Sequence, residues 1–409
     1  MIRLALVGFG GYGGGLIEVI QRVADRVGCR LVAAADARLA ALPEQAKKLA
    51  DAGVELFDDA LRMFDALRGR CEAVYVATSI GTHAPLTIAA AQAGYHVHCE
   101  KPPAATVQEI DAMLAALRAA GRFCLVGFQA LHAADIRLIK DRVVSGRLGR
   151  VRSLACRAAW PRNRSYYTRN DWAGKLRSGE TWVLDGPATN ALAHQITNML
   201  FLASPQPNRL ATPTSVRAEL YAAGPVESHD TAAIEIQTAE GPTAYFIASH
   251  CSDGNFGPII DIDAERGQAV WQMGQGAAIA YADGTQESAR EGNDRERDAM
   301  VANFVEAVRA NDPSGLRCEL SATRPFVLAL DGAHESSGRI HRIPASSSRR
   351  VDEGTDKART VIDGVDDLLI RAARERKLFS ELAETPAWTV RTRSFGLHAY
   401  AKFPVSFEA

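Results

Sequence analysis

The chain has 409 residues, of which 47% are hydrophobic and 23% are charged, and its formal net charge is −1. This length suits two domains, and the composition is ordinary for a soluble globular protein. A charge near zero gives no long-range attraction for nucleic acid or an anionic membrane. No apolar run reaches the ~18 residues of a membrane span, and we expect no signal peptide. We therefore expect neither nucleic acid nor a membrane as a partner.

The first 128 residues alternate between strand and helix patterns. We expect strands at 3–7, 31–35, 54–57, 73–77, 96–99 and 123–128, and helices at 16–27, 39–52, 60–67, 85–93 and 107–119. Most of these strands are continuous apolar runs, which is typical of parallel strands buried on both faces. The alternation predicts an α/β domain with a doubly wound parallel sheet.

From Val151 onward the pattern changes to strands in series. A helix at 131–145 leads out of the first region, and another at 188–203 precedes β-type runs at 215–221, 232–238, 243–250, 259–264 and 269–273. Strands in series predict an antiparallel or mixed sheet. Helices follow at 295–309 and 322–336, then a serine-rich flexible connector at 345–356 and an amphipathic helix at 360–374.

A glycine-rich motif follows the first strand and opens the first helix. The residues Gly8, Phe9, Gly10, Gly11, Tyr12 and Gly13 match the G-x-G-x-x-G dinucleotide fingerprint. Gly8 permits a tight turn, Gly10 lets the backbone approach a pyrophosphate, and Gly13 permits close packing of the helix. Asp36, at the end of the next strand, would bind ribose hydroxyls and repel a 2′-phosphate, whereas Arg38 would accommodate that phosphate. We expect NAD as the cofactor, with NADP as the alternative.

Two further segments end strands of the same sheet. Thr78, Ser79 and His83 follow the fourth strand and are candidates to line the nicotinamide half of the crevice, with helix capping by Ser79 or Thr82 as the alternative. Glu100 and Lys101 follow the fifth strand, where Pro102 and Pro103 stop the strand. Ligands bind just beyond the carboxyl ends of strands in such sheets. We therefore expect the Lys101 ammonium at the mouth of a binding crevice.

These three motifs, in this order and at these spacings, resemble the Gfo/Idh/MocA family of oxidoreductases. The resemblance is good over the first 150 residues and looser through residue 340. It implies a Rossmann domain followed by an α+β domain with an open, mostly antiparallel sheet. It also implies NAD or NADP as cofactor and a reaction at a hydroxyl carbon of a sugar, cyclitol or related polyol. In this family the lysine that matches Lys101 lies at the reacting centre, and the bond to Pro102 is often cis.

The second catalytic motif of the family is an aspartate followed four residues later by a histidine. This chain has Asn190 and His194 at these positions. Residues four apart on a helix share a face, so Asn190 would orient the imidazole without adding the charge that raises its basicity. We therefore expect Lys101 to carry more of the proton transfer. Asp185 is a partial substitute, and Asn198 would extend the polar stripe along the same helix face.

The segment 160–172 is dense in aromatic residues and hydrogen-bond donors, which suit the C–H faces and hydroxyls of a polyol. The candidate substrate contacts are Trp160, Arg162, Tyr166, Tyr167 and Trp172, with His250 at the end of a later strand. The alternative is a surface loop pinned by its aromatic rings.

The seven cysteines are scattered, with no Cys-x-x-Cys pattern and no metal-ligand spacing. We therefore expect no metal site, reduced thiols and a cytoplasmic location. We expect an NAD(P)-binding Rossmann domain at 1–128, a substrate and oligomerisation domain at 129–345, and a linker with a C-terminal extension at 346–409 that packs on the body. An open sheet face favours a homodimer or homotetramer.

Three functions follow from this reasoning. The first is an NAD(P)-dependent dehydrogenase acting on a sugar, cyclitol or related polyol. The second is a reaction without net redox change, namely cleavage or epimerisation of a glycoside through a keto intermediate with tightly bound NAD. The third is a non-enzymatic dinucleotide sensor.

Overall fold

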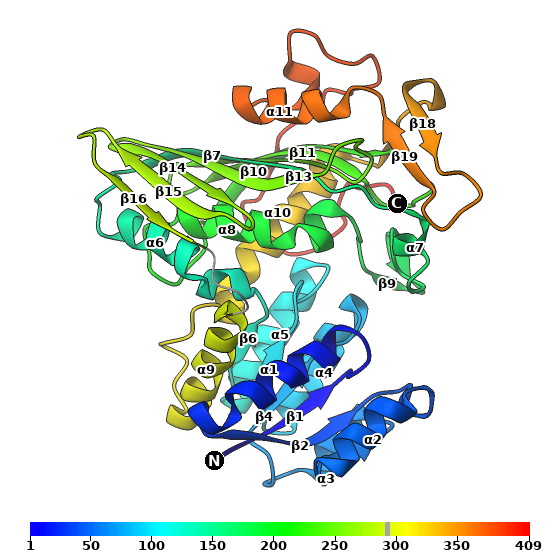
Figure 1. Ribbon diagram of the computed structural model, residues 1–409, viewed down its shortest axis with the longest axis vertical. Helices are drawn as coiled ribbons and strands as arrows, with labels where there is room; N and C mark the ends of the chain where they lie inside the picture. The colour runs from blue at the N-terminus through cyan, green and yellow to red at the C-terminus, as the bar shows by residue number, and fades with distance from the viewer. Residues whose placement is uncertain (291–294) are drawn as a thin grey trace. The chain divides into compact units, whose positions relative to one another are not determined.

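The computed structural model describes residues 1–290 and 295–409, which divide into two compact units (Figure 1). Unit 1 contains Met1–Ala104, Gln108–Ala133 and 295–324, and unit 2 contains Ala105–Val107, 134–290 and Pro325–Ala409. Among the described residues, no helix is both long and apolar enough to cross a membrane.

Unit 1 is built on a six-stranded parallel sheet in the order β3-β2-β1-β4-β5-β6. Its strands are β1 (Ile2–Val7), β2 (Cys29–Ala35), β3 (Glu55–Phe57), β4 (Ala73–Val76), β5 (His96–Cys99) and β6 (Cys124–Val126). The order of connection reverses between β1 and β4. In doubly wound sheets this reversal opens a ligand crevice at the carboxyl ends of the strands. The expected Rossmann architecture is thus confirmed.

The helices of unit 1 include one from late in the chain. They are α1 (Tyr12–Val27), α2 (Pro43–Asp51), α3 (Ala60–Ala66), α4 (Ile80–Gln92), α5 (Val107–Ala120) and α9 (Arg295–Ala310), with 3-10 turns at Leu39–Ala41 and Gln129–His132. The apolar stripe of α9, including Met300 and Phe304, is buried in the same core as Leu16 and Ile20 of α1. The domain division drawn from the sequence differs here, because α9 completes the core of unit 1 rather than of the second domain.

Unit 2 is built on a ten-stranded mixed sheet in the order β16-β15-β14-β13-β7-β12-β11-β10-β17, with β20 pairing with β10. Its strands are β7 (Val151–Ala159), β10 (Pro213–Ala222), β11 (Thr231–Thr238), β12 (Thr243–Ser249), β13 (Phe256–Ala264), β14 (Gly267–Gln272), β15 (Gly276–Tyr281), β16 (Gln286–Ala289), β17 (His341–Arg342) and β20 (Phe395–Gly396). Only the β7–β12 and β10–β17 pairs are parallel. The mostly antiparallel sheet expected from the sequence is confirmed.

Helices cover both faces of this sheet. They are α6 (Ala134–Val144), α7 (Arg164–Tyr167), α8 (Ala193–Ala203), α10 (Leu320–Ser337) and α11 (Val365–Glu375). Figure 1 shows α11 on one face and α6, α8 and α10 on the other. Alternate residues of a strand face opposite sides, and Ala155 and Ile247 pack with Leu369 of α11 in one buried cluster. The sheet face expected to be open is therefore partly covered by the chain's own C-terminal extension.

Three of the expected elements that differ from the structure lie in unit 2. The serine-rich connector is ordered, because β18 (Ser348–Val351) pairs with β19 (Arg359–Ile362). The helix expected from Thr360 begins only at Val365, since the β-branched run 360–362 extends β19. The helix expected at 188–203 is broken at Leu192 into a π-helical turn at Pro187–Ala191 and α8. A short hairpin, β8 (Arg177–Ser178) with β9 (Thr181–Trp182), completes unit 2.

Candidate active site

The glycine motif is fixed by contacts that leave no room for side chains. Gly8 has a φ of 87°, and a Cβ there would lie 2.5 Å from the carbonyl oxygen of Ala77. A Cβ on Gly13 would lie only 1.7 Å from the carbonyl oxygen of Gly8. Gly8 thus lets the loop after β1 touch the loop after β4, and Gly13 lets α1 start directly against that turn.

The first turn of α1 fits a pyrophosphate. Gly11 precedes the helix with a φ of 67°, and no side chain caps the helix N-terminus. Uncapped amides at a helix N-terminus attract anions. Tyr12 is exposed and lies under the guanidinium of Arg297, 5.8 Å from the ring centroid. The side chain of Phe9, in contrast, is buried in the hydrophobic core. Only the backbone of Phe9 is therefore available to a cofactor.

Asp36 and Arg38 meet the middle of the motif. The buried Asp36 carboxylate accepts hydrogen bonds from the amides of Gly10 (3.1 Å) and Arg38 (2.9 Å). The exposed Arg38 guanidinium has its Nε 3.9 Å from Asp36 Oδ1, and a Cβ on Gly10 would lie 2.8 Å from Arg38 Nη2. The carboxylate thus lies where an adenosine ribose follows the pyrophosphate in this fold. This arrangement fits NAD.

The loop after β4 carries hydroxyls that bond to one another. Thr82 donates to the Ser79 carbonyl (2.8 Å) and to Thr78 Oγ1 (2.7 Å). The Ser79 side chain makes no capping hydrogen bond to α4, so the prediction of capping by Ser79 is wrong. Thr78 and Ser79 are half-buried at the carboxyl edge of the sheet.

His83 does not face the crevice, contrary to expectation. It is buried, with Nδ1 2.8 Å from the Pro102 carbonyl and Nε2 3.1 Å from the Thr78 carbonyl. Burial lowers the pKa of His83. The ring thereby links the loop after β4 to the segment that carries Lys101. Its position on the first turn of α4 aims it inward, so we assign it a positioning role.

Glu100 and Lys101 lie where β5 ends. The half-buried Lys101 is joined to Pro102 by a cis peptide bond. The amide of Lys101 donates to Glu100 Oε2 (3.3 Å), whereas Glu100 Oε1 is buried without a hydrogen-bond partner among the described residues. Burial raises the pKa of Glu100, and the positive charge of Lys101 opposes this.

Gly127 is a site residue that the sequence reasoning missed. A Cβ there would lie 2.6 Å from Glu100 Oε1. Because β5 neighbours β4, and β4 neighbours β1, Lys101 shares the carboxyl edge with the glycine motif, two strand spacings or about 10 Å away. The only sequence signal for Gly127 was a glycine directly after β6.

In unit 2, Asp185 supports Asn190 as expected. The Asn190 amide donates to Asp185 Oδ1 (2.7 Å), and the buried Asp185 accepts from the Gly174 amide at Oδ2 (2.6 Å). His194 lies at the start of α8 and is half-buried. The prediction of a continuous polar stripe from Asn190 through His194 to Asn198 is wrong, because the break at Leu192 separates Asn190 from α8. Asn198 is fully buried further along α8.

The aromatic segment forms a ladder that alternates rings and guanidinium groups. Arg162 lies 5.1 Å from the ring centroid of Trp160 and 4.6 Å from that of Tyr166. Arg169 lies 3.7 Å from the Tyr166 centroid and 5.4 Å from that of Trp172. The structure therefore brings together the side chains that the sequence singled out, with Arg169 as a member that was missed.

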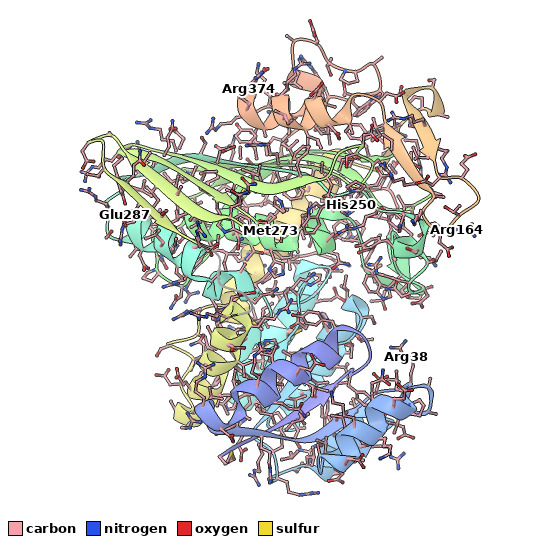
Figure 2. All side chains as sticks on the ribbon, in the orientation of Figure 1. Arg38, Arg164, His250, Met273, Glu287 and Arg374 are labelled. Carbon is pink, nitrogen blue, oxygen red and sulfur yellow. The ribbon has the colours of Figure 1, made fainter. Side chains whose placement is uncertain are left out.

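His250 and Tyr167 flank this ladder. His250 Nδ1 lies 2.9 Å from the Trp160 carbonyl, and its ring centroid lies 6.1 Å from that of Tyr166. His250 directly follows β12, and Figure 2 shows it at the sheet of unit 2. Burial lowers the pKa of His250 to about 3, so the imidazole is neutral at physiological pH. The Tyr167 ring packs edge-on against Tyr166 at 5.2 Å.

Comparisons with known proteins agree with this arrangement. A model of an oxidoreductase family with an NAD-binding Rossmann fold (GFO_IDH_MocA) matches residues 2–128, and a model of the GFO/IDH/MocA C-terminal domain matches residues 136–270. A solved structure of levoglucosan dehydrogenase in complex with NADH and L-sorbose has a TM-score of 0.69 at 20% identity, over 82% of this chain and 96% of that chain. At this identity the likeness shows the fold alone.

Two curated relatives are similar in sequence over shorter stretches. Inositol 2-dehydrogenase of Azotobacter vinelandii is 32% identical over 179 residues, which are 43% of this chain and 47% of that protein. D-glucoside 3-dehydrogenase of Escherichia coli K12 is 30% identical over 162 residues, 38% of this chain and 43% of that protein. The chain thus spans less than half the length of these relatives. Because both domain models match in chain order, the protein belongs to the GFO/IDH/MocA family of oxidoreductases and carries its NAD-binding Rossmann domain.

Proposed function

We propose that the protein is an NAD-dependent dehydrogenase acting on a hydroxyl carbon of a sugar, cyclitol or related polyol. The observation that carries this proposal is the ammonium of Lys101 at the carboxyl edge of an NAD-binding sheet, beside a buried carboxylate. The names of the relatives, which are inositol, D-glucoside and levoglucosan dehydrogenases, support the same substrate class. These names do not favour the reaction without net redox change.

The residues of unit 1 fit the cofactor along the edge of the sheet. The amides of the Gly8–Gly13 loop and of the first turn of α1 would hold the pyrophosphate, and Asp36 would bind the ribose hydroxyls. Thr78, Ser79 and the unpartnered Oε1 of Glu100 would serve the nicotinamide half. When bound, the nicotinamide ring exchanges a hydride with the substrate carbon.

We assign Lys101 as the principal acid–base residue. Its ammonium would donate a hydrogen bond to the reacting oxygen and stabilise the negative charge that develops there. We assign His194 as the second proton-handling residue and Asn190 as the group that orients the substrate or the imidazole. The carboxylate that the family places at position 190 is supplied here by Asp185, one hydrogen bond further away.

The aromatic ladder supports polyol binding with a restriction on its geometry. A guanidinium 3.7 Å from the ring centre covers one face of Tyr166, so that face is closed to a sugar. The end members, Trp160 and Trp172, and the neutral imidazole of His250 remain the substrate contacts that we propose. Arg162 and Tyr167 then act by fixing these groups.

We further propose that the protein is cytoplasmic and forms a homodimer or homotetramer. All seven cysteines are buried thiols outside any disulfide, which suits a reducing compartment. A groove of about 690 Å³ lies between β13–β16 and α11, and its lining includes charged side chains such as Arg157 and Asp261. Light scattering on the purified protein should give a mass of two or four chains, whereas a single-chain mass would overturn the oligomer.

The proposed activity is tested with a panel of sugars and cyclitols assayed with NAD and, separately, with NADP. We expect reduced-nicotinamide absorbance with at least one polyol and with NAD preferred, because Asp36 opposes a 2′-phosphate. Absence of turnover with every member, while NAD still binds, would contradict the proposal and favour a dinucleotide sensor.

A further inference from the structure

Unit 2 contains a cavity of about 570 Å³ to which the proposed function assigns no ligand. Its walls are the segment from Arg162 to Lys175, the loop at 224–230 between β10 and β11, and the β18–β19 hairpin. Figure 2 shows Arg164 on the side of unit 2 that faces this hairpin. The hairpin lies outside both matched domain models, so this wall is an addition of the C-terminal extension. The volume is in the range of small-molecule sites.

The lining is rich in positive charge. It contains five cations, Arg162, Arg164, Lys175, Arg350 and Arg359, against three carboxylates, Asp230, Glu227 and Glu353. Two of the carboxylates are already engaged. The buried Asp230 accepts from the amides of Ala223 and Gly224 (2.9 and 2.7 Å), and Glu353 lies 3.8 Å from Arg350.

Three of these cations have side-chain N–H groups without a hydrogen-bond partner among the described residues. Among the described residues, the side chains of Arg164 and Lys175 make no hydrogen bond and no ion pair. The Nε of Arg162 is buried without a hydrogen-bond partner, while its guanidinium is held between Trp160 and Tyr166. Arg359, in contrast, donates to the Ser252 carbonyl (2.7 Å). Three cations of the pocket therefore have donors available for a ligand, whereas Glu227 is the one carboxylate without a described partner. This excess of positive charge favours an anionic ligand.

Part of the remaining lining is apolar, so a carbon skeleton fits better than a bare ion. Tyr167, Pro225 and Val226 line the same cavity. The backbone at Gly174 packs tightly against Val226 and Tyr167, because a Cβ on Gly174 would lie 2.8 Å from Val226 Cγ1 and 3.0 Å from Tyr167 Cδ1. An acidic organic molecule would match both parts of the lining.

The pocket is also joined to the candidate active site within unit 2. Gly174 lines the cavity, and its amide donates to Asp185, which in turn accepts from the amide of Asn190. Two hydrogen bonds thus connect the pocket wall to a proposed catalytic group. We propose that this pocket holds the oxyanion of an acidic carbohydrate, a carboxylate or a phosphate, and that the proposed dehydrogenase acts on sugars that carry such a group. This inference rests on the proposed function.

The test is a calorimetric titration of the full-length protein without cofactor. The probes are D-glucuronate, D-glucose 6-phosphate, D-glucose and inorganic phosphate. The test variant is R164Q/K175Q, whose two sites are exposed, and the control is R209Q, another exposed arginine of unit 2 without a side-chain partner among the described residues. Thermal unfolding of each variant reports whether the fold is kept.

We expect at least one acidic sugar to bind the unchanged protein more tightly than glucose, with affinity that falls as salt rises. In R164Q/K175Q the acidic sugar should bind roughly tenfold or more weakly, since two charge-assisted contacts are lost, whereas R209Q should not differ. The inference is overturned if neither acidic sugar binds, if glucose is weakened equally, or if inorganic phosphate binds as tightly as the acidic sugars. Because the titration needs no turnover, its failure is distinguishable from an absence of dehydrogenase activity.

Discussion

The cofactor edge of unit 1 and the substrate region of unit 2 are held in place by different means. In unit 1 the critical positions are glycines: Gly8 and Gly13 let backbone segments touch, and Gly127 leaves room for the Glu100 carboxylate. In unit 2 they are polar side chains held by other side chains, as in the contact of Asn190 with Asp185. The first kind of site is fixed by local sterics. The second depends on a network of hydrogen bonds, each of which can be changed separately.

The largest effect is expected where the steric constraint is tightest. Gly13→Ala would place a Cβ 1.7 Å from the Gly8 carbonyl oxygen, so the turn must shift. We expect NAD binding to be lost and unfolding free energy to fall by about 1–3 kcal/mol. Gly15→Ala is the control, because a Cβ there meets nothing within 4 Å and alanine favours a helix. Denaturant unfolding measures the unfolding free energy of each variant, and titration with NAD measures its affinity. If Gly13→Ala and Gly15→Ala had the same stability and the same NAD affinity, the steric account would be refuted.

A smaller effect is expected from the side-chain network of unit 2. Asp185→Asn removes the carboxylate that holds Asn190 and the Gly174 amide, and should cost about 1–3 kcal/mol of transition-state stabilisation with NAD binding unchanged. Asn190→Asp alone would set two carboxylates side by side and should also reduce kcat. The double variant D185N/N190D keeps one charge and should recover part of kcat. Losses that simply add in the double variant would show that the contact does not couple the two residues.

His83 makes the stability of the cofactor edge depend on pH. Because burial lowers its pKa, the folded protein keeps His83 neutral where the unfolded chain takes up a proton. Stability should therefore fall as pH drops below the ordinary value of 6.5, by up to about 1.4 kcal/mol per pH unit. Unfolding free energies of the unchanged protein and of His83→Gln, measured from pH 5 to 8, should converge as pH falls. If the two curves of unfolding free energy against pH ran parallel, His83 would take up its proton as readily in the folded protein as in the unfolded chain, which would contradict this prediction.

The smallest effect is expected from the aromatic ladder. Arg169→Lys keeps the charge but loses the planar group that lies over Tyr166, and should cost about 0.5–1 kcal/mol of loop stability. In kinetics this should raise KM for the polyol a few-fold and leave kcat nearly unchanged. A fall in kcat with constant KM would instead place Arg169 among the groups that act on the transition state.

The same contrast explains what could be predicted from the sequence. The bounds of β5 and the position of Lys101 after it were predicted, because apolar runs and prolines act locally. The packing of α9 into the core of unit 1 was not predicted, because its contacts with α1 join residues that are far apart in the chain. The β18–β19 hairpin was missed because a serine-rich run has weak strand propensity and is ordered here by its partner strand.

Within the candidate site, the glycines of the Gly8–Gly13 motif and Asp36 were predictable from their spacing. The inward orientation of His83 and the insertion of Arg169 into the ladder were not, because each depends on where a side chain points. Asp185 was foreseen as a partial substitute, but its second bond to Gly174, which leads to the cationic pocket, required the folded loop.

The central claim is that Lys101 performs the proton chemistry beside bound NAD. Lys101→Met removes the ammonium and leaves an unbranched, uncharged side chain that is one heavy atom shorter. Once a turned-over polyol is identified, we expect this variant to bind NAD with an affinity close to that of the unchanged protein and to form no measurable NADH. NADH formation by Lys101→Met at a rate close to that of the unchanged protein would contradict the account.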